Sequence, residues 1–284
     1  MTAPIDTIDY LWLVGEEGAR WLARLAEDPR PLAAQAKALR RELSAARAHL
    51  VLQQAELRVR ARAKFAAADR MYFTRRGLEQ ATDETIAAYK AGRFSPGAPV
   101  ADLCCGIGGD LLGLGRRGPA LGVDRDSVCV LLAQANARAV VASPDQVEVR
   151  QQDAQAVRGA EFAAWHIDPD RRPQGRRTTR VGQQEPGVEA IERMLRENPT
   201  AAIKLAPAAH LPDRWAREAE LEWISRARQC RQLVAWFGRL AREPGRRRAT
   251  RVEPAQVHSF LGETADTAPP APRPGRYVFE PDPA

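Results

Sequence analysis

A glycine-rich turn stands near the middle of the chain, directly after a short apolar run. The segment 102–110 reads DLCCGIGGD. In doubly wound α/β sheets the turn after the first strand holds a nucleotide-like ligand, and Gly106 and Gly108 would let the backbone approach it with no Cβ in the way. The dinucleotide pattern G-x-G-x-x-G fails, because Leu111 stands at its third glycine position. The pattern that remains, D-x-x-x-G-x-G, begins at Asp102.

Acidic residues end three successive apolar runs in this region. Asp124 ends the second run, where a carboxylate can accept two hydrogen bonds from adjacent ribose hydroxyls. Asp153 ends the third run and could contact an adenine amino group, and Asp102 would face the cationic or amino end of the ligand. Together the three aspartates predict an adenosine site. The other interpretation is that each caps the following helix, as Asp126 is expected to do for its own helix.

Several segments together resemble a known enzyme family. DLCCGIGGD, GVDRD, QQDA and IDPDRRP resemble the class I S-adenosylmethionine-dependent methyltransferases, and the first is similar to the trimethylguanosine synthase-like RNA methyltransferases. The stretch FTRRGLEQATDETIAAYKAGRF, with IKLAP, EWISRARQC and YVFEPDPA, resembles the bacterial methyltransferase family that carries a C-terminal THUMP-like domain. The resemblance covers residues 50–284. It implies a Rossmann-like methyltransferase fold, S-adenosyl-L-methionine as the cofactor, and RNA as the substrate.

The resemblance also implies roles for individual residues. The residues expected to bind the cofactor are Asp102, Cys104, Gly106, Gly108, Asp124, Asp153, Gln80 and Thr82. The last two belong to the segment before the first strand, which would cover the cofactor, and in the same segment Phe73 and Thr74 are expected on the substrate side. The alternative for this segment is a helix that links domains, with Thr82 as its N-cap.

The fourth apolar run leads into the motif DPDRRP at residues 168–173. Pro169 restricts the backbone, so Asp168 would be presented rigidly at the strand end. Enzymes that methylate exocyclic amines resemble one another in an Asp/Asn-Pro-Pro-aromatic motif here, whose aromatic residue stacks on a flipped base. This chain has Asp170 and Arg171 in the third and fourth positions, which removes that platform. Asp168 is the first candidate for orienting or deprotonating the acceptor, and Asp170 is the second.

Basic residues near this motif are candidates for substrate binding. Arg171 and Arg172 could hold a phosphate through bidentate hydrogen bonds, or they could pair with the neighbouring aspartates instead. Lys204, near the end of the fifth apolar run, is expected to line the substrate side. His166 is expected to pack beside Trp165. No set of residues has the spacing of a metal site, so no metal is predicted.

The chain changes character along its length. Between Pro31 and Gly77 there is no glycine or proline, and strong helix formers dominate, which predicts a helical N-terminal domain over residues 1–76. From residue 97, short apolar runs alternate with helical segments, which predicts an α/β domain at 77–252 with a mostly parallel, doubly wound sheet. Residues 253–284 are expected to be a proline-rich linker and the start of a truncated THUMP-like segment.

Composition and charge limit the function classes. The chain has 284 residues, of which 44% are hydrophobic and 28% charged, with neither a signal peptide nor a membrane span expected, so a cytoplasmic protein is predicted. The net charge is +7. Residues 36–76 carry eleven Lys and Arg against three acidic residues, whereas residues 77–170 carry eight against thirteen. Basic segments around an acidic centre favour a partner with a phosphate backbone.

The leading hypothesis is therefore a cytoplasmic methyltransferase that uses S-adenosyl-L-methionine and acts on RNA. Two alternatives stay open. The fold could be retained in a non-catalytic RNA-binding protein, which the missing aromatic of the DPDRR motif favours, or the enzyme could methylate small molecules or proteins. A nicotinamide oxidoreductase is disfavoured because Leu111 replaces the fingerprint glycine. The sequence does not reveal the oligomeric state.

Overall fold

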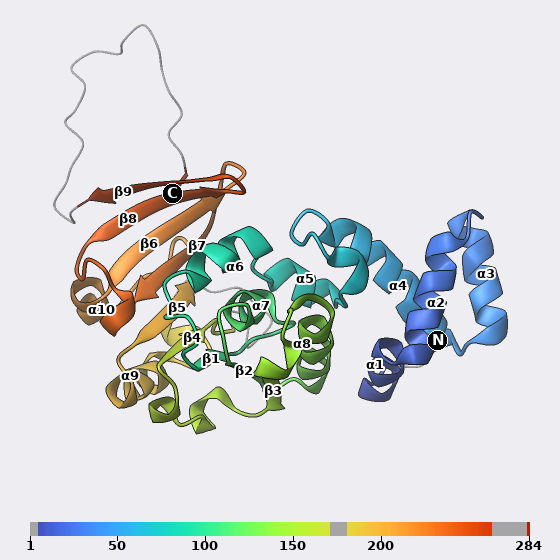
Figure 1. Cartoon of the computed structure of the whole chain (residues 1–284), viewed down its shortest axis with the longest axis horizontal. Coiled ribbons are helices and arrows are strands. Elements are labelled where there is room, and N and C mark those ends of the chain that lie inside the picture. The colour runs from blue at the N-terminus through green and yellow to red at the C-terminus, as the bar shows by residue number, and fades with distance from the viewer. Residues whose placement is uncertain (1–4, 171–180, 263–282) are drawn as a thin grey trace, which may run out of the picture. The chain divides into compact units, whose positions relative to one another are not determined.

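The computed structural model describes residues 5–170, 181–262 and 283–284 (Figure 1). Its strands are β1 Val100–Leu103, β2 Ala120–Asp124, β3 Val147–Gln151, β4 Ala164–Ile167, β5 Ala201–Leu205, β6 Glu220–Arg226, β7 Gln229–Trp236, β8 Arg247–Glu253 and β9 Gln256–Gly262. Over the described residues these nine strands form one mostly parallel sheet, ordered β3-β2-β1-β4-β5-β7-β6-β8-β9. The order runs outward in both directions from β1 and β4, which confirms the predicted Rossmann-like, doubly wound architecture. The chain divides into two compact units, residues 1–91 with 105–153 and residues 92–104 with 154–284.

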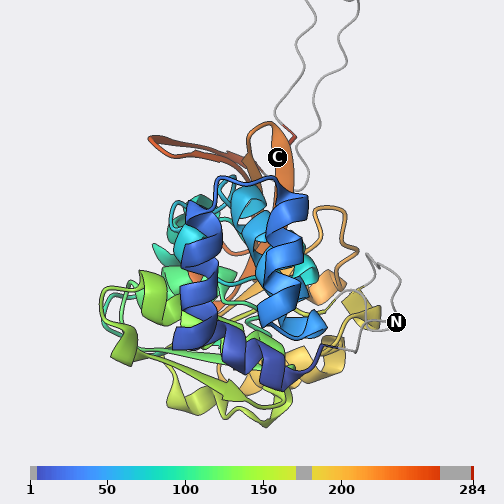
Figure 2. The same cartoon turned by 90° about the vertical axis from the view of Figure 1, so that its right-hand side faces the viewer.

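The first unit begins with the predicted helical region. Its helices are α1 Thr7–Val14, α2 Glu16–Glu27, α3 Leu32–Glu42 and α4 Ala45–Ala61, and they pack side by side (Figure 2). Side-chain caps start two of them: Asp6 accepts from the Asp9 N–H at 3.0 Å, and Ser44 accepts from the Arg47 N–H at 3.3 Å.

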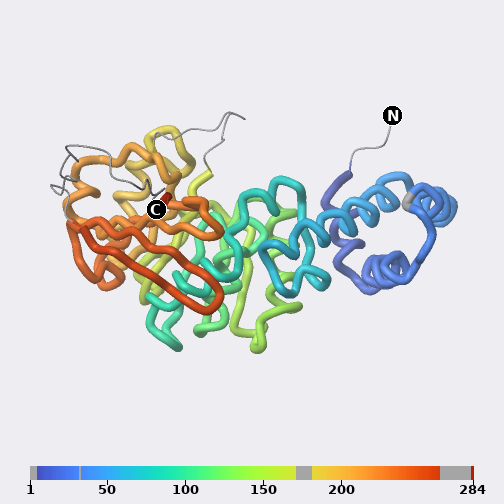
Figure 3. Tube along the Cα trace, turned by 90° about the horizontal axis from the view of Figure 1, so that it is seen from above, coloured from blue at the N-terminus to red at the C-terminus, as the bar shows by residue number. Residues whose placement is uncertain are grey.

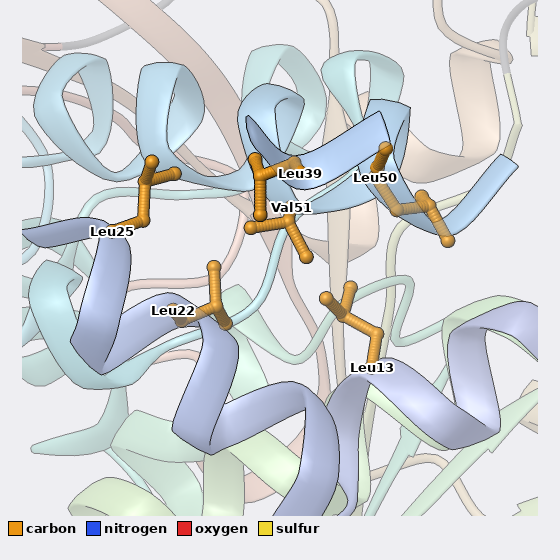
Figure 4. Packing of buried hydrophobic residues seen from close by; sticks show 7 residues of the cluster. Leu13, Leu22, Leu25, Leu39, Leu50 and Val51 are labelled. Atoms are coloured by element: carbon orange, nitrogen blue, oxygen red, sulfur yellow. The ribbon is translucent and has the colours of Figure 1, made fainter. Parts of the chain in front are cut away.

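A leucine-rich core holds these helices together. Figure 4 shows its buried side chains, which come from all four helices: Leu13, Leu22, Leu25, Leu39, Ala48, Leu50 and Val51. Gly18 makes the corner between α1 and α2 possible, since a Cβ there would lie 2.3 Å from the Leu13 carbonyl oxygen. Burial of this apolar surface stabilises the helical region at about 25 cal/mol per Å².

The remainder of the first unit supplies the turn and helices around the glycine-rich segment. It contains η1 Ala68–Arg70, α5 Arg75–Gln80, α6 Glu84–Ala91, α7 Gly109–Gly115, α8 Ser127–Val140 and η2 Pro144–Gln146. Strands β2 and β3 pair in parallel, with Asp124 opposite Gln151. Asp126 caps α8, accepting from the N–H groups of Val128 and Cys129 at 2.8 and 3.2 Å, so the predicted cap is confirmed.

The second unit holds the parallel strands β1, β4 and β5 and the antiparallel pair β6–β7. Its helical segments are η3 Ala154–Ala156, η4 Gly159–Glu161, η5 Val181–Gln183, α9 Val188–Glu197, α10 Asp213–Glu218 and η6 Gly238–Leu240. Strands β1, β4 and β5 are buried at every position. Continuous rather than alternating burial is expected of parallel strands covered on both faces.

Residues 256–262 differ from the expected linker, because they form strand β9. This strand pairs antiparallel with β8 from Arg247 opposite Gly262 to Glu253 opposite Gln256, and Figure 3 shows the hairpin in red. The segment QVHSFLG contains β-branched and aromatic residues, whereas the proline-rich composition that indicated a linker begins only after it. The linker prediction is therefore wrong for these seven residues. The predicted domain boundaries at residues 76 and 252 stay predictions.

A buried charge network lies in the second unit between Arg93 and strand β6. Arg93 donates to both oxygens of Glu220, at 2.9 and 3.0 Å, and to Glu222 at 3.0 Å. Arg248 donates to Glu220 at 2.6 Å. Both glutamates are fully buried, so without these partners they would each leave an uncompensated charge in the interior.

We predict acid-sensitive stability from this network. Burial alone would raise the pKa of Glu220, but hydrogen bonds, chiefly from Arg93 and Arg248, outweigh it and lower the pKa from 4.5 to about 2. A depressed folded-state pKa gives stability that is complete above the unfolded value and is lost as pH falls toward 2, here about 3 kcal/mol. Urea unfolding of the wild type should show this loss between pH 5 and 2, and Glu220→Gln should show a smaller one. Equal pH dependence in both proteins would contradict the assignment.

Candidate functional site

In the first unit, the glycine-rich loop closes back onto the end of β2. The Cys105 N–H donates to the Val123 carbonyl at 2.9 Å, and the Gly108 N–H donates to the Cys105 carbonyl at 2.9 Å. Gly106 and Gly108 have φ of +55° and +94°, a left-handed conformation that glycine adopts without cost. A Cβ added at Gly106 would meet no atom within 4 Å, so open space lies beside the backbone at this point.

Asp124 is the residue that holds this loop. Its Oδ2 accepts from the Gly106 N–H at 2.8 Å, and its Oδ1 accepts from the Asp126 N–H at 3.0 Å. Burial raises the pKa of Asp124, while these two backbone hydrogen bonds act in the opposite direction. Asp124 is not a helix cap, because Asp126 caps α8. Each carboxylate oxygen has a second lone pair, so Asp124 can also accept hydrogen bonds from a ligand's hydroxyls.

Two further residues predicted to bind the cofactor, Cys104 and Asp153, follow the strands β1 and β3. Cys104 has a φ of +59°, which is uncommon for a residue with a side chain, and it is half-buried. Asp153 is exposed and follows Gln152, whose N–H donates to the Asp124 carbonyl at 3.0 Å. The backbone hydrogen bond therefore ties the turn that carries Asp153 to the residue that holds the loop.

The segment before the first strand contributes buried and capping residues to the first unit. Phe73 is buried, and its ring packs against that of Phe65 with centroids 5.9 Å apart. Thr74 caps α5, its Oγ1 accepting from the Gly77 N–H at 2.9 Å. Gln80 Oε1 accepts from Arg76 Nε at 3.2 Å.

Thr82 is bonded to a carboxylate instead of capping a helix. Its Oγ1 donates to Asp110 Oδ2 at 2.6 Å. The first turn of α6 is capped by Asp83, whose Oδ1 accepts from the N–H groups of Thr85 and Ile86, both at 3.1 Å. The alternative that assigned the N-cap to Thr82 is therefore wrong.

Asp110, which accepts from Thr82, also forms a buried ion pair, and sequence reasoning missed it. Lys90 Nζ lies 2.6 Å from Asp110 Oδ1, and the two side chains are only 2% and 8% exposed. Asp110 stands in the first turn of α7, directly after the glycine-rich loop. The one available signal was a lysine within the otherwise apolar second half of α6, at a position that the helix buries. Since an unpaired buried charge is costly, Lys90 and Thr82 together fix the position of Asp110.

In the second unit, Asp102 is paired with a histidine. Asp102 on β1 stands opposite His166 on β4, and Asp102 Oδ1 lies 2.6 Å from His166 Nδ1. Both side chains are almost fully buried. His166 was expected only to pack beside Trp165, so its hydrogen bond to Asp102 is a feature that sequence reasoning missed.

The DPDRR motif begins at the end of β4 in the same unit. Asp168 Oδ2 lies 2.5 Å from Lys204 Nζ, and Lys204 is 6% exposed while Asp168 is 25% exposed. Asp168 is thus partly accessible and held by a buried cation. Pro169 is buried, and Asp170 exchanges two backbone hydrogen bonds with Glu185, at 2.8 and 3.0 Å. Arg171 and Arg172 lie outside the described residues.

The described part of the chain offers neither a metal-binding cluster nor a membrane-spanning helix. Among residues 5–170, 181–262 and 283–284, no group of three or more His, Cys, Asp or Glu is arranged to hold a metal ion. Within the same residues, no helix combines the length and apolarity needed to cross a bilayer.

Comparison with known proteins shows the fold. No family model matches the chain, and no curated protein matches it significantly. Among solved structures, a candidate methyltransferase from Porphyromonas gingivalis W83 aligns with a TM-score of 0.70 and 17% identity, covering 96% of this chain and 70% of that one. An RNA methyltransferase from Salinibacter ruber, in complex with S-adenosyl-L-homocysteine, aligns with a TM-score of 0.40 and 15% identity, covering 57% of this chain and 94% of that one.

A third similar structure is the magnesium protoporphyrin IX methyltransferase of Synechocystis PCC 6803 with bound S-adenosylmethionine, with a TM-score of 0.39 and 14% identity, covering 84% of this chain and 98% of that one. The likeness to the Porphyromonas structure extends over nearly the whole chain at a high score. It shows that the two chains share a Rossmann-like fold, over a length that includes the N-terminal helical region of this chain.

We predict that the Thr82 hydroxyl stabilises the first unit. Thr82→Val removes a hydrogen bond to the buried Asp110 carboxylate and should lower the free energy of unfolding by about 1.5–3 kcal/mol. Thr82→Ser keeps the hydroxyl and should lose less than about 1 kcal/mol, because only a methyl group is removed. Urea unfolding measures both variants. Equal stability of the two would show that the hydrogen bond contributes nothing.

Proposed function

We propose that this chain is an S-adenosyl-L-methionine-dependent methyltransferase that acts on RNA. The observation that carries the cofactor assignment is the glycine loop held by Asp124, with open space beside Gly106 and spare acceptor capacity on the carboxylate. An adenosyl group needs both features, since its ribose presents two adjacent hydroxyls and its bulk needs an approach free of side chains. The methyltransferase fold supports the same assignment.

The residues present fit the cofactor. Asp124 would accept hydrogen bonds from the ribose hydroxyls, Gly106 and Gly108 would line the nucleoside, and Asp153 would lie on the adenine side. Asp102 would face the amino end, with His166 fixing the orientation of its carboxylate. Gln80 and Cys104 would make further contacts with the cofactor, and Thr82 would contribute through Asp110, to which it is bonded.

The residues of the DPDRR motif would carry out the methyl-transfer step. When bound, the cofactor would supply a methyl group on a positively charged sulfur for in-line attack by the acceptor, with the carbon–sulfur bond breaking and the sulfur leaving as a neutral thioether. The protein must therefore align the acceptor and take up one proton where the acceptor carries one. Asp168 is partly exposed and held by Lys204, so its carboxylate can orient the acceptor and receive that proton. Pro169 fixes its backbone, and Asp170, Arg171, Arg172 and Thr74 remain candidates for acceptor contacts. Phe73, which is buried against Phe65, would support the segment that carries Thr74 from inside.

RNA is favoured as the acceptor because of the charge of the N-terminal helical region. The segment 36–76 carries eleven Lys and Arg against three acidic residues. Several of these arginines are exposed, among them Arg40, Arg41 and Arg70. Cationic side chains at such positions bind phosphates mainly by releasing counterions, without reading the base sequence.

We predict that the isolated protein binds S-adenosylhomocysteine. Isothermal titration calorimetry should detect binding by the wild type, and Asp124→Asn should weaken it at least about ten-fold, because it removes a charged acceptor of hydrogen bonds. Asp145→Asn, which changes an exposed acidic residue of the same unit, should bind as the wild type does. A folded wild type that does not bind the ligand would overturn the cofactor assignment.

We further predict RNA binding that depends steeply on salt. Fluorescence anisotropy with a single-stranded RNA should give an association constant that falls with salt at a log–log slope of about −2 or steeper, which corresponds to at least about three phosphate contacts. Arg40→Gln with Arg41→Gln should reduce the slope. RNA binding without S-adenosylhomocysteine binding would select the non-catalytic alternative. The converse would select a small-molecule or protein acceptor.

A further inference from the structure

One buried amide joins the glycine loop to a distant segment of the first unit. Asn136 on α8 is 0% exposed. Its Oδ1 accepts from the Tyr72 N–H at 2.7 Å, and its Nδ2 donates to the Tyr72 carbonyl at 3.0 Å and to the Ile107 carbonyl at 3.0 Å. The side chain therefore uses both amide protons and its oxygen, and one of these bonds ends inside the glycine loop.

The bond to Ile107 restrains the most flexible part of the loop. Ile107 stands between Gly106 and Gly108, which both have positive φ. Because glycine has access to left- and right-handed backbone conformations alike, peptide planes between two glycines reorient easily. A hydrogen bond to the Ile107 carbonyl fixes the plane of the peptide that follows it, and hence the direction of the Gly108 N–H.

The same segment meets the loop at a second point. A Cβ added at Gly77, in α5, would lie 2.6 Å from Cγ2 of Ile107. The absence of a side chain at residue 77 thus allows α5 to pack directly on the loop. Asn136 and Gly77 together join residues 72–77 and the loop into one packed structure, although the two are separated by about thirty residues of chain.

A second amide gives the matched control. Gln54 on α4 is 1% exposed, and it makes the same pair of bonds one residue further along: its Nε2 donates to the Phe73 carbonyl at 3.0 Å, and its Oε1 accepts from the Phe73 N–H at 2.9 Å. No hydrogen bond of Gln54 reaches the loop among those that the described residues make. The two amides therefore share burial and backbone chemistry and differ in the contact with Ile107.

We propose that Asn136 is a positioning residue for the cofactor loop, which sets the loop's conformation through the Ile107 carbonyl and couples it to residues 72–77. This inference rests on the proposed function. It extends the site to a side chain on α8 and distinguishes Asn136 from buried polar residues whose only task is to stabilise the fold.

The test compares two isosteric variants, Asn136→Asp and Gln54→Glu. In each variant, a carboxylate oxygen replaces the amide NH2 group, which donates to two backbone carbonyls in Asn136 and to one in Gln54. Both variants should therefore have a lower midpoint of thermal unfolding. Calorimetric titration with S-adenosylhomocysteine, well below that midpoint, should show affinity at least ten-fold weaker for Asn136→Asp and within two-fold of the wild type for Gln54→Glu. Equal affinity in the two variants would overturn the positioning role while leaving the proposed function intact.

Two further outcomes have to be distinguished: a variant that does not fold, and a wild type that does not bind the ligand. If Asn136→Asp does not fold, the pair Asn136→Ala and Gln54→Ala removes the amides without introducing a charge, and the same difference in affinity is expected. If the folded wild type itself does not bind S-adenosylhomocysteine, the proposed function fails and this inference fails with it.

Discussion

The hydrogen bond from the Gly106 N–H to the Asp124 carboxylate is the interaction on which the candidate site depends. It closes the glycine loop onto the end of β2 at 2.8 Å. Left-handed glycines give the loop its tight path, but they also give it freedom, and a charged acceptor in a buried position is a strong restraint on that freedom. The same carboxylate accepts a hydrogen bond from the Asp126 N–H at 3.0 Å, and Asp126 in turn caps α8. The loop, the strand end and the helix start are thus joined through Asp124 and Asp126, two residues apart in the chain.

In both units, acidic residues at or near the candidate site are paired with a lysine or a histidine. Lys90 with Asp110, His166 with Asp102, and Lys204 with Asp168 each bring an acidic residue of a strand end or helix start together with a basic or ring-nitrogen partner at 2.5–2.6 Å. Such pairs contribute little net stability, because desolvation opposes their attraction. Their effect is to hold each carboxylate in one orientation, which is what a binding site requires of its polar groups.

Much of the fold and part of the site could be predicted from the sequence. Continuous apolar runs separated by helical segments gave the parallel sheet, and the Asp-to-glycine spacing located the loop, because both are local patterns. The pairs Asp102–His166 and Lys90–Asp110 could not be predicted, since they depend on strand register and helix packing between segments distant along the chain. Strand β9 was not predicted because the proline-rich residues that follow it led us to assign the whole segment 253–284 to a linker. The assignment of Thr82 to the cofactor site stays a prediction, and its hydrogen bond to Asp110 was not foreseen.

The most direct test of the account is amide hydrogen exchange of the wild type with and without S-adenosylhomocysteine. If the glycine loop holds an adenosyl group, the ligand should slow exchange in residues 105–109 and in the turn after Asp124, and leave the helices α2 and α3 unchanged. Unchanged exchange in the loop, with protection appearing elsewhere in the chain, would contradict the assignment of this loop as the cofactor site.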